Sequence, residues 1–205
     1  MEIKIFVEGD ADRKFLTDYI DHSFSLKLEK EDIVTAGGWT KMGAPNNQGE
    51  SIRNAISKNT DEGGVNLLIF DADEDYNQRF QDIEDWKREY KLEFITFLFP
   101  NNSESGDLET LLENIINPIN SPIFECWKNY EICLRSKTIP ERKEPLTTPA
   151  RKTKIYGYLE ALLGESKSQK EKIKEVNRNY KDKNHWDLDS IYLKNLNNFL
   201  GNYLS

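Results

Sequence analysis

The sequence predicts an α/β fold, with a mostly parallel four-stranded sheet flanked by helices and a helical C-terminal extension. In the first half of the chain, short apolar runs alternate with amphipathic stretches. The runs 65–70 and 94–99 are apolar almost throughout, as expected of strands buried on both faces. Repeated strand–helix alternation favours a parallel sheet whose strands are joined by right-handed crossovers.

The elements of the first half follow from their apolar spacing. Ile3, Ile5 and Val7 predict the first strand, and Asp10 or Asp12 can then cap a helix whose apolar residues recur every three or four positions. Glycines, prolines and asparagines mark the turns between later elements. Those elements are, in order, a strand over 33–36, a loop over 43–49, a helix around 52–56, a strand over 65–70, a helix over 74–90 and a strand over 94–99.

The second half has a helical pattern, with polar segments at 137–149 and 164–183 that we expect on the surface. Cys126 and Cys133 are seven positions apart in an expected helix, too far for a disulfide, and we expect both in the core. The predicted division is an α/β domain over 1–115 and a helical extension over 116–205 that packs on it. The expected helices of this half cover 108–116, 124–134, 155–163 and 193–204.

Charge is distributed unevenly along the 205 residues, which carry a net charge of −8. Residues 1–110 contain 12 Lys/Arg against 24 Asp/Glu, whereas residues 111–205 contain 16 against 12. The net charge argues against a protein that coats nucleic acid. An acidic half beside a mildly basic half suits a metal site next to a surface that receives a phosphate backbone, although chance asymmetry of a solvated surface is an equal alternative.

The sequence contains no apolar run near the roughly 18 residues that a membrane span needs. Residues 1–10 lack the basic and then apolar pattern of a signal peptide. We therefore expect a cytoplasmic protein. Its two histidines have no partner at a zinc-ligand spacing, so any metal would be held by oxygen.

Acidic residues directly follow the predicted strand 65–70. Asp71 and Asp73 alternate as strand residues do, so both point to one side at the carboxyl edge of the sheet. Paired carboxylates repel each other unless a cation lies between them, and hard oxygen ligands favour Mg²⁺ or Mn²⁺. The alternative is helix capping, but three acids within five residues exceed what a cap needs.

Two further acidic groups follow other strands of the predicted sheet. Glu8 and Asp12 flank Gly9 after the first strand, and capping explains Asp12 but not Glu8. Asp107 and Glu109 follow the fourth strand at the start of a helix, where Asp107 as an N-cap is the equal alternative. Ligands of parallel sheets bind at the carboxyl ends of the strands, so these acids are expected to form one site.

These motifs resemble the Rossmann-like TOPRIM domain of topoisomerases, primases and OLD-family nucleases. The matching motifs are FVEG at 6–9, followed by Asp12, and LIFDAD at 68–73. FPNN at 99–102 and DLE at 107–109 resemble a small stand-alone TOPRIM-like family of unknown function. The likeness covers about residues 1–115. The chain departs from many such domains because no glycine follows shortly after the aspartate pair, so the resemblance implies less about how substrate approaches than about metal binding.

The resemblance implies a site for two divalent metals, Mg²⁺ or Mn²⁺, and a later lysine that stabilises the scissile phosphate. By resemblance this lysine is Lys154 or, as the second choice, Lys152. Glu8 and Lys154 would then be the catalytic residues. The implied metal ligands are Glu8, Asp12, Asp71, Asp73 and Asp107.

The expected function is divalent-metal-dependent phosphodiester hydrolysis of DNA or RNA. A basic stretch over 135–154 could hold the phosphate backbone, with a solvated loop as the alternative. OLD proteins carry an ATPase domain, but this chain has no Walker A motif, so a separate ATPase is a possible partner. The alternatives are a non-catalytic metal- or nucleotide-binding or regulatory module and an accessory subunit of such an ATPase. His185 and Trp186 are expected to be structural.

Overall fold

Four parallel strands form the sheet of the computed structural model, which describes residues 2–42, 47–164 and 166–204. The strand order is β2-β1-β3-β4, and all three strand pairs are parallel. This arrangement confirms the predicted α/β class. The strands are β1 (Ile3–Val7), β2 (Ile33–Thr35), β3 (Val65–Asp71) and β4 (Ile95–Phe99).

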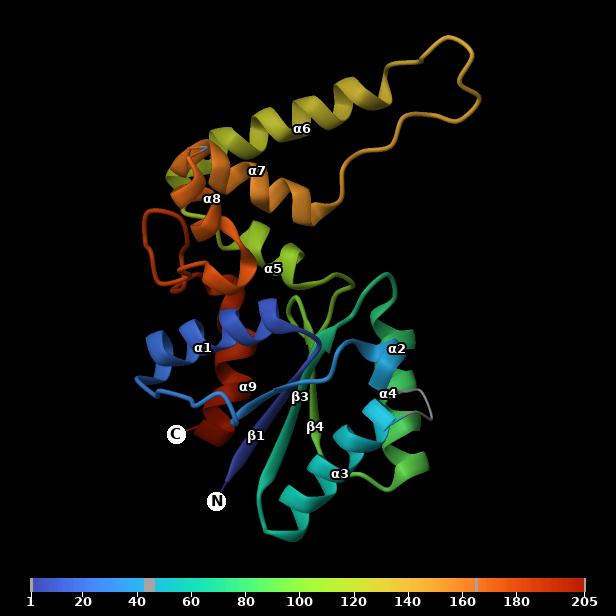
Figure 1. Ribbon diagram of the computed structural model, residues 1–205, viewed down its shortest axis with the longest axis vertical. Coiled ribbons are helices and arrows are strands. Elements are labelled where there is room, and N and C mark those ends of the chain that lie inside the picture. The colour runs from blue at the N-terminus through green and yellow to red at the C-terminus, as the bar shows by residue number, and fades with distance from the viewer. Residues whose placement is uncertain (1, 43–46, 165, 205) are drawn as a thin grey trace.

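Alternation along the strands divides the core between the two faces of the sheet. Ile5, Ile69 and Phe97 belong to one hydrophobic cluster, together with the apolar side of α1 (Asp10–Phe24). Residues of the opposite parity form a second cluster with α3 (Asn47–Asp61) and α4 (Tyr76–Tyr90). Figure 1 shows α1 and α9 on one side of the strands and α2, α3 and α4 on the other.

The C-terminal extension shares the first hydrophobic cluster with the sheet. Ile155, Tyr158, Trp186 and Leu200 are buried in the same cluster as Ile5. The extension is therefore packed on the α/β domain through apolar side chains. Helix α5 (Leu108–Asn114) closes the α/β domain. The α-helices of the extension are α6 (Ser121–Arg135), α7 (Arg151–Leu163), α8 (Lys167–Ile173) and α9 (Lys194–Leu204), with short 3-10 turns at Pro118–Asn120, Glu175–Asn177 and Ile191–Leu193.

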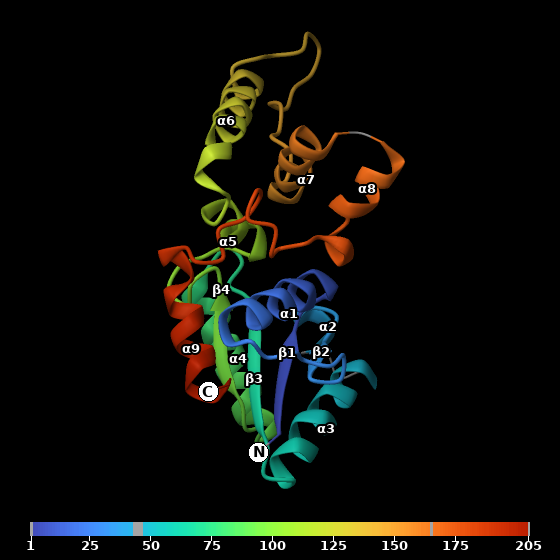
Figure 2. The ribbon, with the colours of Figure 1, turned by 90° about the vertical axis from the view of Figure 1, so that its left-hand side faces the viewer.

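Helices α6 and α7 and the connection 136–150 form an arm that projects beyond the carboxyl end of the sheet (Figures 1 and 2). Phe124 of α6 packs on Tyr158 of α7, with ring centroids 5.1 Å apart. The other side of α6 faces solvent, and none of its residues is fully buried. The expectation that Cys126 and Cys133 are core residues is therefore wrong, because both are exposed on this helix.

The structure also changes several expected boundaries. Helix α7 begins at Arg151, four residues before the predicted start, and a short helix α2 (Trp39–Met42) was not predicted. The segment 164–183 is not simply a surface segment, because it contains α8 and the buried side chains of Ile173, Arg178 and Tyr180. In the predicted loop 43–49, residues 43–46 lie outside the described part of the chain, and α3 begins at the next residue.

No helix in the described ranges is both long and apolar enough to cross a membrane.

Candidate functional site

The ends of β1 and β3 bring Glu8 and Asp71 together at the carboxyl edge of the sheet. The two strands are paired, with Val7 opposite Ile69, so both acids leave the sheet at the same edge. The backbone N–H of Asp71 donates a hydrogen bond to Glu8 Oε1 at 3.3 Å. Gly38 passes close to Glu8 with a φ of +94°, a conformation that favours glycine.

Asp12 lies in the first turn of α1 and is only 7% exposed. Its Oδ2 accepts a hydrogen bond of 2.7 Å from the backbone N–H of Gly9. Burial, followed by the negative charges of Glu8 and Glu109, raises the pKa of the Asp12 carboxyl to about 7. Asp12 therefore caps the helix, and its carboxyl group also faces other acids.

Asp71 ends β3 and reaches the start of α5. Its Oδ1 accepts a hydrogen bond of 3.0 Å from the backbone N–H of Leu108. Burial of the Asp71 carboxyl raises its pKa well above the usual range. Four neighbouring carboxylates raise the pKa further: Asp12, Glu8, Asp107 and Glu109.

Glu109 belongs to the same group, although it was not among the predicted ligands. Burial raises the pKa of its carboxyl group, and the charge of Asp107 acts in the same direction. Burial also raises the pKa of Glu8, where the charge of Asp73 adds to the effect. The sequence signal for Glu109 was its position in DLE, two residues after a helix cap. We call Glu8, Asp12, Asp71 and Glu109 the acidic cluster.

The structure places the other two predicted ligands, Asp73 and Asp107, differently. The Asp73 side chain is half exposed and forms an ion pair with Arg79, and its φ of +53° turns the chain away from strand geometry. Asp107 is the N-cap of α5, since its Oδ1 accepts a hydrogen bond of 2.8 Å from the backbone N–H of Thr110. An arginine nitrogen of Arg151 lies 3.4 Å from the same oxygen.

Lysines of α7 approach the acids to different extents. Lys154, the first choice for a catalytic lysine, forms an ion pair of 2.7 Å with Glu113 and lies over the Phe124 ring. Lys152 is 2.6 Å from Glu175, and its positive charge lowers the pKa of Glu109. Of these two lysines, Lys152 is therefore the one whose charge acts on a member of the acidic cluster, Glu109.

The donor chemistry of the acidic cluster fits a hard divalent cation. Within the described ranges, no Lys, Arg or His nitrogen lies within 4 Å of any of its four carboxylates. Buried carboxylates without a counter-charge are unstable in the ionised form, and a bound cation would relieve this. No group of three Asp, Glu, His or Cys among the described residues is already arranged around a metal position. Binding would therefore require side chains to turn toward the ion.

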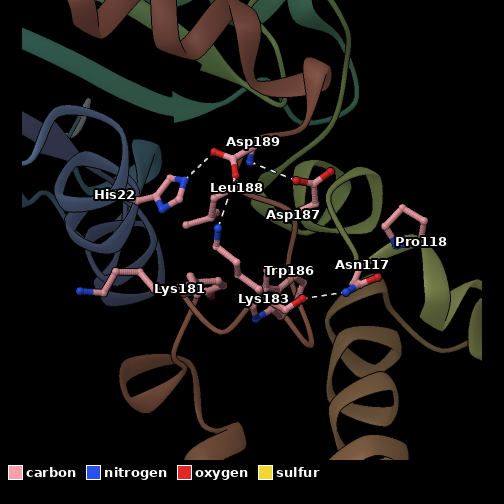
Figure 3. Close-up of a pocket in the computed structure, with 10 residues that line it drawn as sticks. His22, Asn117, Pro118, Lys181, Lys183, Trp186, Asp187, Leu188 and Asp189 are labelled. Carbon is pink, nitrogen blue, oxygen red and sulfur yellow. Dashed lines mark hydrogen bonds and ion pairs between the residues drawn. The ribbon is translucent and has the colours of Figure 1, made fainter.

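A separate small cavity of about 120 Å³ lies between the end of α1 and the C-terminal segment (Figure 3). His22 Nε2 lies 2.7 Å from Asp189 Oδ1, and Lys183 Nζ lies 3.9 Å from the other oxygen of Asp189. Lys181 pairs with Asp21 at 2.5 Å. These ion pairs connect α1 with the C-terminal segment. The cavity therefore lies at a junction where paired charges hold this segment on α1.

A family model described as a protein of unknown function, DUF3226, matches residues 2–205, and the chain belongs to this family. No curated protein and no solved structure matches the chain.

Proposed function

We propose that this family member is a Mg²⁺- or Mn²⁺-dependent phosphodiesterase that hydrolyses nucleic acid, as a TOPRIM-like nuclease would. The observation that carries the proposal is the acidic cluster at the carboxyl edge of a parallel sheet. Its four carboxylates lack positively charged partners within 4 Å among the described residues. A divalent cation bound among these carboxylates would compensate their negative charge.

Glu8, Asp12 and Asp71 would form the centre of the metal site. Glu109 adds a fourth oxygen donor, and Asp73 and Asp107 would join if Arg79 and Arg151 release them. A bound divalent cation supplies Lewis acidity that activates water and stabilises the leaving oxygen. Burial raises the pKa of Glu8 in the metal-free chain, and a bound cation would favour the ionised form of this carboxylate.

The arm supports nucleic acid as the substrate. Lys128, Lys137, Arg142 and Lys143 are exposed on it, and no carboxylate in the described ranges lies within 4 Å of their charged groups. Unpaired cations on a projecting element can contact a phosphate backbone and release its counterions. The arm projects beyond the carboxyl end of the sheet (Figure 1), the end at which β1 and β3 bring Glu8 and Asp71 together.

A non-catalytic metal- or nucleotide-binding module is the second candidate function. The ion pairs of Asp73 with Arg79 and of Asp107 with Arg151 favour it, because they leave three of the five predicted ligands free of a cationic partner. An accessory subunit of a separate ATPase is a further form of this alternative. The exposed side chains of Ile119, at 79%, and Ile132, at 53%, could contact such a partner.

The test is incubation of the purified chain with supercoiled DNA, linear DNA and RNA, with Mg²⁺, Mn²⁺ or chelator. We expect cleavage that needs the metal and is lost in the double variant Asp12→Asn, Asp71→Asn. Asp61→Asn, which neutralises an exposed acid at the end of α3, is the matched control and should cleave normally. Mn²⁺ binding without cleavage of any substrate would favour the non-catalytic module, and absence of Mn²⁺ binding would contradict both the phosphodiesterase and a metal-binding module.

A further inference from the structure

One arginine lies at the edge of the acidic cluster, on the side of α4. Arg79, near the start of this helix, donates a hydrogen bond from Nη2 to Oδ2 of Asp73. Burial raises the pKa of the Glu8 carboxyl, and the positive charge of Arg79 acts in the opposite direction. The guanidinium is therefore paired with one predicted metal ligand and is close enough to another to act on its charge.

Aromatic packing fixes the position of this guanidinium. Its central carbon lies 5.5 Å from the centroid of the Trp39 ring, an arrangement that attracts the cation to the ring. Trp39 in turn packs edge-to-face on the buried Trp86, with ring centroids 6.1 Å apart. The Arg79 side chain is only 15% exposed. These contacts do not involve Asp73, so they would hold the arginine in place after its ion-pair partner has left.

Asp73 is the less firmly held partner of the ion pair. Its side chain is 51% exposed, and within the described ranges its only side-chain hydrogen bond comes from Arg79. Ion pairs with an exposed partner contribute little to stability. A divalent cation at the acidic cluster could therefore take over the Asp73 carboxylate at little cost, and the Arg79 guanidinium would lose its anion.

The Arg79 guanidinium also has hydrogen-bond donors that the described residues do not use. Arginine carries five N–H groups in a planar fork, which match the oxygens of a carboxylate or of a phosphate. The side chain gives one hydrogen bond to a described residue, Asp73, while Nε is buried without a partner among those residues. The carboxylate of Asp73 thus occupies a position where a phosphate oxygen would also be accepted.

We propose that Arg79 binds the phosphate of the nucleic acid substrate at the metal site, in the place that Asp73 takes in the metal-free chain. This inference rests on the proposed function, because it needs a phosphodiester held beside the acidic cluster. As water attacks the phosphorus atom and the bond to the leaving oxygen breaks, negative charge increases on the non-bridging oxygens. Arg79 stays protonated throughout and donates hydrogen bonds to one of these oxygens.

Binding of a short strand tests this contact without hydrolysis. The probe is a thymidine tetranucleotide with phosphorothioate linkages, which carry the negative charge and resist cleavage. The reference is the same strand with uncharged methylphosphonate linkages. Calorimetry of the full chain at saturating Mn²⁺ measures the affinity for each strand. We expect the parent to bind the charged strand about tenfold or more tightly than the uncharged one.

Arg79→Gln removes the charge and should weaken binding of the charged strand about tenfold or more, while affinity for the uncharged strand stays the same. Mn²⁺ affinity should be equal to that of the parent or higher, because Asp73 is released and a positive charge beside Glu8 is lost. Arg88→Gln breaks the ion pair of Arg88 with Asp85 on the same helix. This matched control should bind Mn²⁺ and both strands as the parent does.

Arg79→Lys keeps the charge without the planar fork, and should bind the charged strand more tightly than Arg79→Gln does. With a cleavable strand, Arg79→Gln should lower kcat about a hundredfold. Equal affinities of the parent, Arg79→Gln and Arg79→Lys for the charged strand would overturn the phosphate contact. A loss of Mn²⁺ affinity in Arg79→Gln would also overturn it, because it would indicate a structural role.

The same measurements separate this inference from the proposed hydrolysis. A parent that cleaves nucleic acid at the same rate as Arg79→Gln, with equal affinities for the charged strand, would contradict the role of Arg79 and leave the phosphodiesterase standing. A parent that binds the charged strand through Arg79 but cleaves no substrate would contradict hydrolysis and support the phosphate contact. A parent that does not distinguish the charged from the uncharged strand would overturn the contact, whatever it cleaves.

Discussion

Buried carboxyl groups at the sheet edge should make the metal-free protein most stable in mild acid. The pKa of Asp12 is about 7 in the folded chain, above the value of about 3.9 for an exposed aspartate. The folded state therefore binds the proton more tightly, so stability falls as pH rises from about 4 to 7 and changes little above that range. Asp71 acts in the same direction.

We expect the free energy of unfolding in chelator to be on the order of 2 kcal/mol lower at pH 8 than at pH 5. Denaturant titration at the two pH values measures it. Asp12→Asn should reduce the difference, whereas the control Asp61→Asn should keep it. A chain that becomes less stable on acidification over this range would contradict the prediction.

Substitution of Asp71 separates metal binding from folding. Asp71→Asn removes the charge but keeps an oxygen that can accept the hydrogen bond from the Leu108 backbone. We therefore expect the metal-free variant to be as stable as the parent or about 1 kcal/mol more stable, because repulsion among the acids is reduced. Its Mn²⁺ affinity, measured by calorimetry, should fall tenfold or more. A large loss of metal-free stability would indicate a packing role instead.

The two lysines of α7 are expected to differ in function. Lys154→Met breaks a half-buried ion pair with Glu113 and should lower stability by about 1 kcal/mol. Lys152→Met removes the positive charge that acts on Glu109, and we expect it to reduce metal-dependent cleavage more strongly than Lys154→Met does. Melting curves and initial cleavage rates of both variants decide this. The reverse order of activities would return the role to Lys154.

At the scale of elements, the arm makes a separate prediction about nucleic acid binding. The triple variant Lys137→Ser, Arg142→Ser, Lys143→Ser removes three exposed cations that pair with no described carboxylate. If each contacts one phosphate of a duplex, the slope of log affinity against log salt should decrease by about 2.7. Mn²⁺ affinity should not change.

A control variant replaces exposed lysines outside the arm by serine, at Lys27, Lys30 and Lys194. It has the same net charge as the arm variant but leaves the projecting element intact. Filter binding to a duplex over a range of salt concentrations compares the two. Equal loss of slope in both variants would mean that overall charge, rather than the arm, determines affinity.

The elements that sequence could predict are those whose pattern is set by burial on the sheet. The apolar runs at 65–70 and 94–99 identified β3 and β4 because both faces of these strands are covered. Helix α8 was missed because its residues are almost all charged or polar, although Ile173 is buried. Cys126 was misplaced because spacing on a helix does not reveal which helix face a tertiary neighbour covers.

Sequence reasoning about the acids succeeded where strand ends determine position. Pairing of β1 with β3 brings Glu8 beside Asp71, as expected from parallel strands that end at one edge. It could not determine that Asp73 turns toward Arg79 or that Glu109 faces the cluster. Both depend on backbone geometry after the strand, which residue types alone do not specify.

At the scale of the whole molecule, the acidic cluster connects strands of the sheet to α1 and α5, the helices that pack on the face formed by Ile5, Ile69 and Phe97. Its members come from the ends of β1 and β3 and from the first turns of α1 and α5. A cation bound by all of them would stabilise the folded chain as a unit rather than one loop. At a Mn²⁺ concentration 100 times the dissociation constant, the expected gain is about 2.7 kcal/mol.

Two tryptophans can test whether this gain is global, because each reports on one of the two hydrophobic clusters. Trp86 lies in the cluster beside α4, and Trp186 in the cluster shared with the extension. Single-tryptophan variants, with the other tryptophans replaced by phenylalanine, should show the same rise in unfolding free energy on Mn²⁺ addition. Chelator should reverse it, and Asp12→Asn should abolish it. A cooperative unit that includes both hydrophobic clusters must unfold in one transition. A rise confined to the Trp186 probe would therefore mean that the cation stabilises only the cluster that contains Trp186.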